Sequence, residues 1–134
     1  MDEIEYRIEP ELSGRDLNRL FASAWENHTE REFGPVLEQS LTYVGAFDGF
    51  RLVGFVNVAW DGGIHGFILD TTVHRGFQRR GIGTEMMKRA AKIAAARGIE
   101  WLHVDYEPHL HTFYRKCGYG KTEAGLLNLR DEAT

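Results

Sequence analysis

The segment Gln78–Thr84, Gln-Arg-Arg-Gly-Ile-Gly-Thr, constrains the fold most. It lies between a β-type run that ends at Val73 and a helical run over 81–97 that Gly98 closes. The first N–H groups of a helix have no intrahelical partner, and the helix dipole adds positive potential there. Glycines let an anion approach such a backbone closely. The sequence therefore predicts a strand–turn–helix unit that holds a phosphate group, with a tight turn that uses glycine only for steric reasons as the alternative.

The charge distribution supports an anion at this turn. The chain has 16 basic and 20 acidic residues, a net charge of −4. Six of the basic residues but only one acid, Glu85, lie in the window 75–92, which makes the window +5 and the remainder −9. This pattern predicts a small polyanionic ligand at the window, whereas an acidic protein as a whole disfavours nucleic acid as a partner. A solvated helix face is the alternative.

The rest of the chain predicts one mixed α/β domain. A length of 134 residues with 43% hydrophobic residues is typical of a single globular domain, here 1–134. Asp-Gly turn signals separate three β runs, which predicts an antiparallel meander, and a helical crossover makes the next strand parallel. We expect strands over 4–8, 42–47, 51–60, 67–73, 101–106 and 125–130, and helices after a cap at Ser13 and over 33–41, 81–97 and 110–117.

A second motif follows about one helix and one strand later. It is Phe-Tyr-Arg-Lys-Cys-Gly-Tyr over Phe113–Tyr119. A phenol such as Tyr114, with an ordinary pKa near 10, is a suitable acid for a leaving thiolate of comparable basicity. The alternative is that Tyr114 is an aromatic residue of the core.

These two motifs together resemble a known family. The stretch Val73–Thr84 resembles the acetyl-CoA signature of the GNAT superfamily of N-acetyltransferases, Gln/Arg-x-x-Gly-x-Gly/Ala. Phe113–Tyr119 is similar to the downstream segment of that family, Phe-Tyr-x-Lys-x-Gly-Phe. The resemblance implies a fold of the α/β class, α+β type, with a mixed, V-shaped central sheet of six to seven strands and about four flanking helices.

The resemblance also implies where the co-substrate acetyl-CoA binds. Its pantetheine arm would lie where the strand ending at Val73 parts from the strand 101–106, and would pair with the backbone as an added strand does. Its pyrophosphate would lie on the amides of the glycine turn. The cofactor-binding residues predicted in this way are Leu69, Thr71, Val73, Gln78, Arg79, Arg80, Gly81, Ile82, Gly83 and Thr84.

The chemistry of amine acetylation asks for further groups. Tyr114 matches the family's usual general acid. The amine must lose a proton before it attacks the thioester, and the candidate bases are Asp70, Asp105, Glu107, His109 and His111. Asp70 lies in an otherwise apolar run, so we interpret it as catalytic, with an acid in a sheet bulge or at a sheet edge as the alternative. Glu107 and Leu110 stand where family members often carry Asn and Ala, so we interpret Glu107 as catalytic or substrate-directed. His109 and His111 are assigned to the substrate pocket rather than to a metal site, and no metal is expected.

The sequence therefore predicts an acetyl-CoA-dependent N-acetyltransferase that acts on a primary amine of a small molecule or peptide by direct attack on the thioester. The acidic balance outside the basic window favours a cationic acceptor. A non-catalytic acyl-CoA-binding or regulatory module on the same fold is the alternative, because a fold does not determine a function.

Composition predicts a cytoplasmic protein. Cys117 is the only cysteine, which excludes an internal disulfide and fits a reducing compartment. No run approaches the roughly 18 consecutive apolar residues of a membrane span, and the first residues are acidic, unlike a secretory signal. We expect neither a membrane nor nucleic acid as a partner, and a homodimer stays open.

Overall fold

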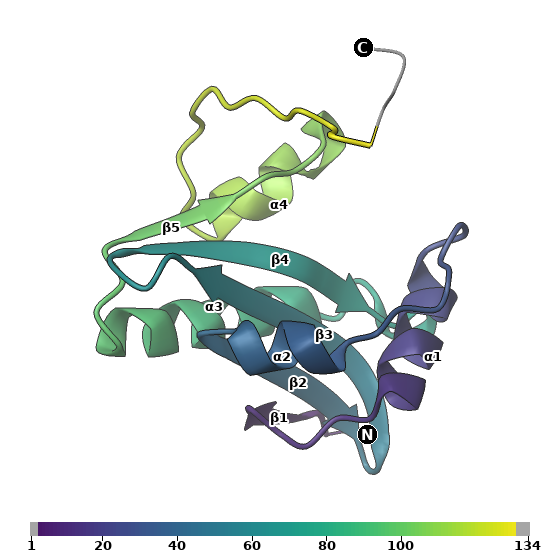
Figure 1. Ribbon diagram of the computed structural model, residues 1–134. Helices are drawn as coiled ribbons and strands as arrows, with labels where there is room; N and C mark the ends of the chain where they lie inside the picture. Colours follow the sequence, from purple (N-terminus) through teal and green to yellow (C-terminus); the bar gives the residue numbers. More distant parts are fainter. Residues whose placement is uncertain (1–2, 131–134) are drawn as a thin grey trace. The chain divides into compact units, whose positions relative to one another are not determined.

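Runs rich in valine and aromatic residues form one five-stranded sheet in the computed structural model, which describes residues 3–130 (Figure 1). The strand order is β1-β2-β3-β4-β5. β1 to β4 pair antiparallel, whereas β5 is parallel to β4. The meander and the parallel crossover strand are therefore confirmed. The strands are β1 (Glu5–Ile8), β2 (Thr42–Asp48), β3 (Arg51–Trp60), β4 (His65–Val73) and β5 (Trp101–Val104).

The expected count of six to seven strands is not confirmed, because the described residues contain five. The strand expected over 125–130 is wrong: this segment has no strand partner within residues 3–130, and its three leucines are 74 to 88% exposed. A strand needs a neighbour that satisfies its backbone hydrogen bonds, which an apolar pattern alone does not supply. β5 also ends two residues earlier than expected, at Val104.

Local signals set the helix boundaries. The Ser13 hydroxyl accepts a hydrogen bond from the Asp16 N–H at 3.0 Å and caps the first helix, as predicted. Gly98, with φ +94°, follows the end of the long helix. The described residues contain four α-helices and two short 3₁₀ helices: α1 (Gly14–Ala24), α2 (Gly34–Gln39), η1 (Arg75–Phe77), α3 (Ile82–Ala96), η2 (Pro108–Leu110) and α4 (His111–Lys116).

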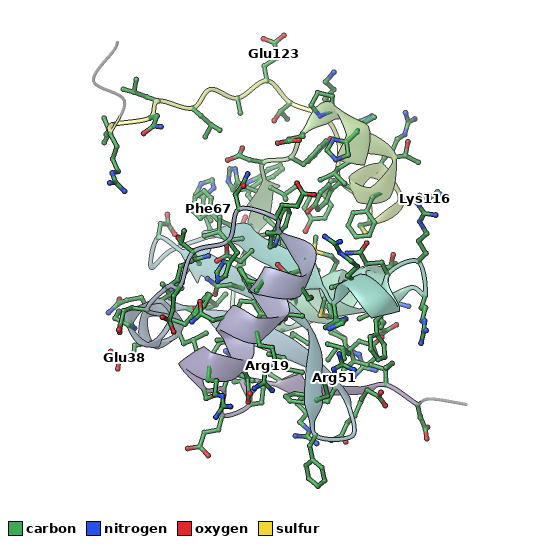
Figure 2. All side chains as sticks on the ribbon, turned by 90° about the vertical axis from the view of Figure 1, so that its right-hand side faces the viewer. Arg19, Glu38, Arg51, Phe67, Lys116 and Glu123 are labelled. Atoms are coloured by element: carbon green, nitrogen blue, oxygen red, sulfur yellow. The ribbon has the colours of Figure 1, made fainter. Side chains whose placement is uncertain are left out.

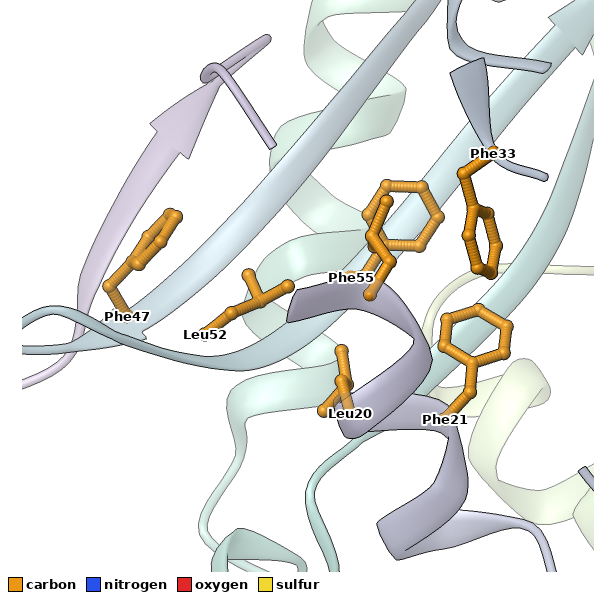
Figure 3. Packing of buried hydrophobic residues seen from close by; sticks show 7 residues of the cluster. Leu20, Phe21, Phe33, Phe47, Leu52 and Phe55 are labelled. Atoms are coloured by element: carbon orange, nitrogen blue, oxygen red, sulfur yellow. The ribbon is translucent and has the colours of Figure 1, made fainter. Parts of the chain in front are cut away.

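The two longest helices cover opposite faces of the sheet. Phe55 of β3 packs into the hydrophobic cluster that contains residues of α1, which Figure 3 shows. Its neighbour Gly54 faces α3, where an added Cβ would lie only 2.9 Å from the Met86 sulfur. Successive residues of a strand point to opposite faces, so α1 and α3 lie on different sides. The cluster consists of Leu17, Leu20, Phe21, Phe33, Phe47, Leu52 and Phe55. Each such side chain contributes about 1.5–3 kcal/mol by its burial.

The chain divides into two compact units, Met1–Val104 and Asp105–Thr134. The sheet with α1, α2 and α3 belongs to the first unit, and η2 with α4 belongs to the second.

Candidate active site

The pairing of β4 with β5 stops halfway along β4. The last pair joins Ile68 to Val104, and β4 continues to Val73. Within the described residues, the stretch 69–73 has no partner on this side. Phe67, which Figure 2 labels, lies just before this point. A ligand with amide groups can pair with such a strand edge as an added strand does, so the residues expected to bind pantetheine lie on backbone that is suited to it.

The turn after β4 has the conformation that the glycines predict. Gly81 has φ +82° and is the N-cap of α3, and Arg79 has φ +65°. The Gln78 side chain donates to the Val73 carbonyl at 3.1 Å and ties the turn to the strand end. The first intrahelical bond of α3 runs from the Glu85 N–H to the Gly81 carbonyl at 3.0 Å. The N–H groups of the residues between them precede the helical ladder and can hold a phosphate group.

Three arginines bring positive charge to this turn. Arg79 and Arg80 are exposed. The Arg80 guanidinium lies 4.9 Å from the ring centre of Phe77, and that of Arg51 lies 5.7 Å from the same ring. Arg51 comes from the start of β3 (Figure 2) and was not among the predicted site residues. Arg51 lies 26 residues before Phe77 in the sequence, so no local pattern predicts that the two are in contact.

His74 organises the same turn, although sequence reasoning assigned it no role. Its Nδ1 is 3.0 Å from the Gly76 nitrogen, and its Nε2 is 2.9 Å from Nη2 of Arg51. Burial, and then the charge of Arg51, lowers the pKa of His74 below its ordinary value. His74 is therefore favoured as the neutral imidazole, which can accept the Gly76 N–H and begin η1.

Asp70 lies in a bulge of β4. Phe55 pairs with Thr72 and Asn57 with Leu69, so two residues of β4 oppose a single residue of β3. Asp70 itself has φ +58°, in the left-handed region that non-glycine residues rarely adopt. Such strain is typical of functional sites and costs on the order of 1–3 kcal/mol. The sheet-bulge alternative for Asp70 is thus correct as to its position, and its catalytic role stays a prediction.

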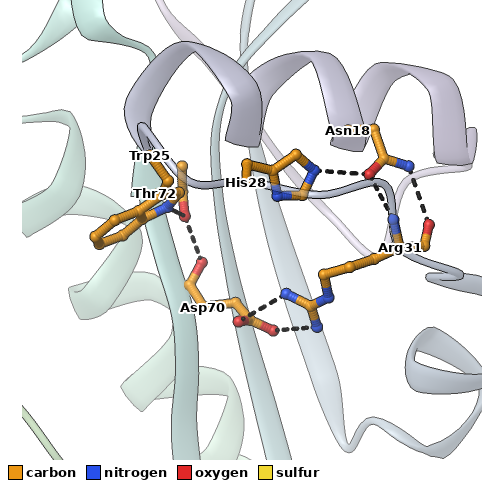
Figure 4. Close-up of polar contacts among 6 residues, drawn as sticks. All are labelled: Asn18, Trp25, His28, Arg31, Asp70 and Thr72. Atoms are coloured by element: carbon orange, nitrogen blue, oxygen red, sulfur yellow. Dashed lines mark hydrogen bonds and ion pairs between the residues drawn. The ribbon is translucent and has the colours of Figure 1, made fainter.

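The Asp70 carboxylate has a partner that was not foreseen. Arg31 Nη1 and Nη2 lie 3.3 and 3.4 Å from its two oxygens (Figure 4). The Thr72 hydroxyl donates to the Asp70 carbonyl at 3.0 Å and accepts from Trp25 Nε1 at 3.2 Å. Arg31 is 39 residues from Asp70 in the chain, so no pattern in the sequence predicted the pair.

In the second unit, Tyr114 lies in an aromatic cluster. It is 6% exposed and stacks on Tyr106 with ring centres 4.7 Å apart. The Tyr106 hydroxyl lies 2.8 Å from Nδ1 of His111. Burial raises the pKa of Tyr119, whose ring meets that of Tyr114 at 6.0 Å, to about 12. Tyr114 is therefore surrounded by rings that fix its orientation.

Glu107 caps the start of η2, and His109 lies within it. The carboxylate of Glu107 lies 3.5 Å from Nδ1 of His109, and both side chains are at least 70% exposed. In the first unit, the residues expected to bind the cofactor and the candidate base Asp70 thus lie in one continuous stretch, 69–84. The structure brings Glu107 and His109 together, and His111 together with Tyr106, in the second unit.

The site thus lies on a mixed sheet with a parallel crossover strand and a glycine turn at the start of the crossover helix. The sequence model of the acetyltransferase (GNAT) family matches residues 8–119. The chain therefore belongs to the GNAT acetyltransferase family, which confirms the resemblance seen in the two motifs.

One curated relative is an uncharacterized N-acetyltransferase, ycf52, of Porphyra purpurea. It is 34% identical over 79 residues, which are 59% of this chain and 45% of that protein. The chain spans about half the length of the curated relatives it matches, between 45% and 61%.

Solved structures share the fold. A GNAT family acetyltransferase of Streptococcus pneumoniae TIGR4 has a TM-score of 0.76 at 24% identity, covering 96% of this chain and 100% of that one. The aminoglycoside N-acetyltransferase AAC(6′)-Iy, solved in complex with CoA, has a TM-score of 0.77 at 14% identity, covering 98% and 97%. Likeness at this identity establishes the fold and nothing further.

No helix within residues 3–130 has the length and apolar character that a membrane crossing requires. In the same part of the chain, no three His, Cys, Asp or Glu side chains are grouped so that they could hold a metal ion. The expected absence of a metal stays a prediction.

Proposed function

We propose that this protein transfers an acetyl group from acetyl-CoA to a primary amine of a small molecule or peptide. The observation that carries the proposal is one continuous stretch, 69–84. Its β4 backbone has no partner on the β5 side within the described residues, and it leads into the glycine turn and the first turn of α3. Acetyl-CoA has amides along its pantetheine arm and a pyrophosphate beyond them. The stretch offers a strand edge for the first and helix N–H groups for the second.

The reaction joins the amine nitrogen to the thioester carbonyl carbon and breaks the carbon–sulfur bond. A proton leaves the nitrogen, and a proton reaches the departing thiolate. We assign the second proton to the Tyr114 hydroxyl and the first to Asp70 or Glu107, directly or through water. A backbone N–H near Leu69–Asp70 would stabilise the oxyanion.

Two observations favour an amine as the acceptor: the charge of this chain and the names of its relatives. The remainder of the chain outside the basic window carries −9, which favours a cationic acceptor. A relative and a solved structure of the same fold are named N-acetyltransferases.

Release of free thiol from acetyl-CoA in the presence of a panel of primary amines tests the proposal, with mass spectrometry of the acetylated product. We expect release that depends on the amine. Acetyl-CoA binding in calorimetry without thiol release across the panel would instead support the non-catalytic acyl-CoA-binding module. Absence of both binding and release would remove the cofactor assignment.

A further inference from the structure

Arg31 is anchored independently of its ionic partner. It lies in the segment between α1 and α2, where the Asn18 side chain holds its backbone (Figure 4). Asn18 Oδ1 accepts the Arg31 N–H at 2.9 Å, and Asn18 Nδ2 donates to the Arg31 carbonyl at 3.0 Å. His28 Nε2 lies 2.8 Å from the same Oδ1. The Arg31 backbone, from which the side chain extends, is therefore held in place without any contact to Asp70.

Aromatic rings fix the other end of the side chain. The guanidinium carbon lies 4.7 Å from the ring centre of Phe33 and 5.6 Å from that of Phe21, and both rings are buried. A planar guanidinium gains cation–π attraction from such rings while its N–H edge stays available to an acid. The edge that Arg31 presents at Asp70 is thus preorganised for a carboxylate.

Asp70 is anchored from the opposite side. The bulge and its left-handed φ direct its side chain, and the Thr72 hydroxyl, bonded to Trp25, holds its carbonyl. It lies two residues after Ile68, where β4 parts from β5, and this is the strand edge at which the proposed function needs the acceptor amine.

The contact between the two groups is long. Arg31 and Asp70 are separated by 3.3 and 3.4 Å, whereas three other arginine–carboxylate pairs of the described residues meet at 2.7 to 2.8 Å. Charge-assisted hydrogen bonds are normally about 2.7–2.9 Å long. The side chains of Arg31 and Asp70 are also 39% and 25% exposed, so a ligand can reach both. The two opposite charges are thus anchored separately, lie farther apart than in an ordinary ion pair, and are accessible. Such an arrangement is suited to bind a zwitterion.

We propose that Arg31 and Asp70 select an acceptor that carries a carboxylate beside its amine, as an amino acid does. Arg31 binds the carboxylate of the acceptor with its fork of N–H groups, and Asp70 binds the ammonium group. The acceptor thereby replaces one ion pair with two and brings its nitrogen to the strand edge. This inference rests on the proposed function and narrows its substrate class.

The test compares matched acceptors. Each set contains a free amino acid, its carboxamide and its decarboxylated amine, and kcat/KM is measured for all three with acetyl-CoA. We expect the free acid to exceed its carboxamide by roughly 10- to 100-fold, the range for hydrogen bonds to charged groups. Equal rates for acid and carboxamide would overturn the inference and leave the proposed function intact. No turnover of any of these acceptors would overturn the inference, and no turnover across the panel of primary amines as well would overturn the proposed function with it.

Variants locate the preference. Arg31→Gln should bring the ratio of acid to carboxamide close to one, and Arg31→Lys should retain part of it because the charge remains without the fork. Arg7→Gln is the matched control, since Arg7 is also paired with a carboxylate, 42% exposed and 4.3 Å from a ring centre, that of Phe47. Its ratio should equal that of the parent. An unchanged ratio in Arg31→Gln or in Arg31→Lys, with thermal unfolding like the parent's, would contradict the inference.

Discussion

Neighbouring groups determine the state of several single side chains around the glycine turn and around Tyr114. Burial and then the charge of Arg51 lower the pKa of His74, and the rings around Tyr114 orient it. Asp70 has a strained backbone conformation, and its carboxylate contacts Arg31. In each case the residue type follows from the sequence, whereas its state follows from groups that are distant in the chain.

The lowered pKa of His74 makes stability depend on pH. Because the folded-state pKa is below the unfolded one, the unfolded state binds the proton more readily, and folding loses stability as pH falls through about 6.5 and below. The loss should be smaller in His74→Gln, which cannot be protonated, and in Arg51→Gln, which removes the repelling charge. Urea unfolding of the three proteins between pH 8 and pH 5 measures this. Parallel curves for parent and His74→Gln would show that the imidazole has no such role.

Tyr114→Phe removes one oxygen and keeps the ring that packs against Tyr106. We expect kcat to fall by about 10²–10⁴-fold, the usual contribution of a general acid. Affinity for acetyl-CoA should change little, since the hydroxyl acts mainly in the transition state. The measurement is kcat as a function of pH for both proteins, with the best amine of the panel as acceptor. A Phe variant within about twofold of the parent would be well short of a general-acid effect and would make Tyr114 a packing residue.

At the scale of elements, β4, the glycine turn and α3 form one continuous backbone surface. The strand edge left unpaired after Ile68 continues into a turn that presents the first N–H groups of a helix. α3 is in turn held against the sheet by buried methionines, with Met86 against Gly54. A rigid helix start lets the backbone recognise an anion without side-chain rearrangement.

Gly83→Val places a branched side chain in the first turn of α3. It should block the close approach of pyrophosphate and weaken acetyl-CoA binding severely, because the helix N–H groups are then covered. Gly14→Val is the control: Gly14 also begins a helix, and an added Cβ there meets nothing within 4 Å. Calorimetry on both folded variants provides the comparison. Unchanged affinity in Gly83→Val would remove the phosphate assignment.

At the scale of the whole molecule, charge is separated along the chain. The window 75–92 carries +5 in a protein whose remainder carries −9. Opposite signs of this kind attract a polyanion to one place and cations to others. The arginines of the turn are exposed, so their attraction acts through solvent and is open to screening by salt.

Affinity for acetyl-CoA should therefore fall as salt rises, because ions screen exposed charges beyond about 10 Å at 0.1 M. Arg79→Ala and Arg80→Ala should each flatten this dependence. Calorimetric titrations at several salt concentrations give the slopes. Full salt independence in the parent would mean that the basic window is a solvated face without a role in binding.

Much of the fold could be predicted from sequence because its signals are local. The Ser13 cap, the turn at Gly49 and the ends of α3 depend on residues within a few positions of each other. The glycine turn of the candidate site could be predicted for the same reason. The strand expected over 125–130 is wrong because a strand requires a neighbour, and the sequence of the segment does not reveal whether one is present.

The sequence by itself determined the family, the meander with its parallel strand, and the stretch suited to a pyrophosphate. Only the tertiary structure decided that Asp70 lies in a bulge, that Arg31 from 39 residues away meets it, and that Arg51 touches His74. The physical reason is range. Caps, turns and periodicity act within a few residues, whereas ion pairs and shifted pKa values arise between groups that only folding brings together.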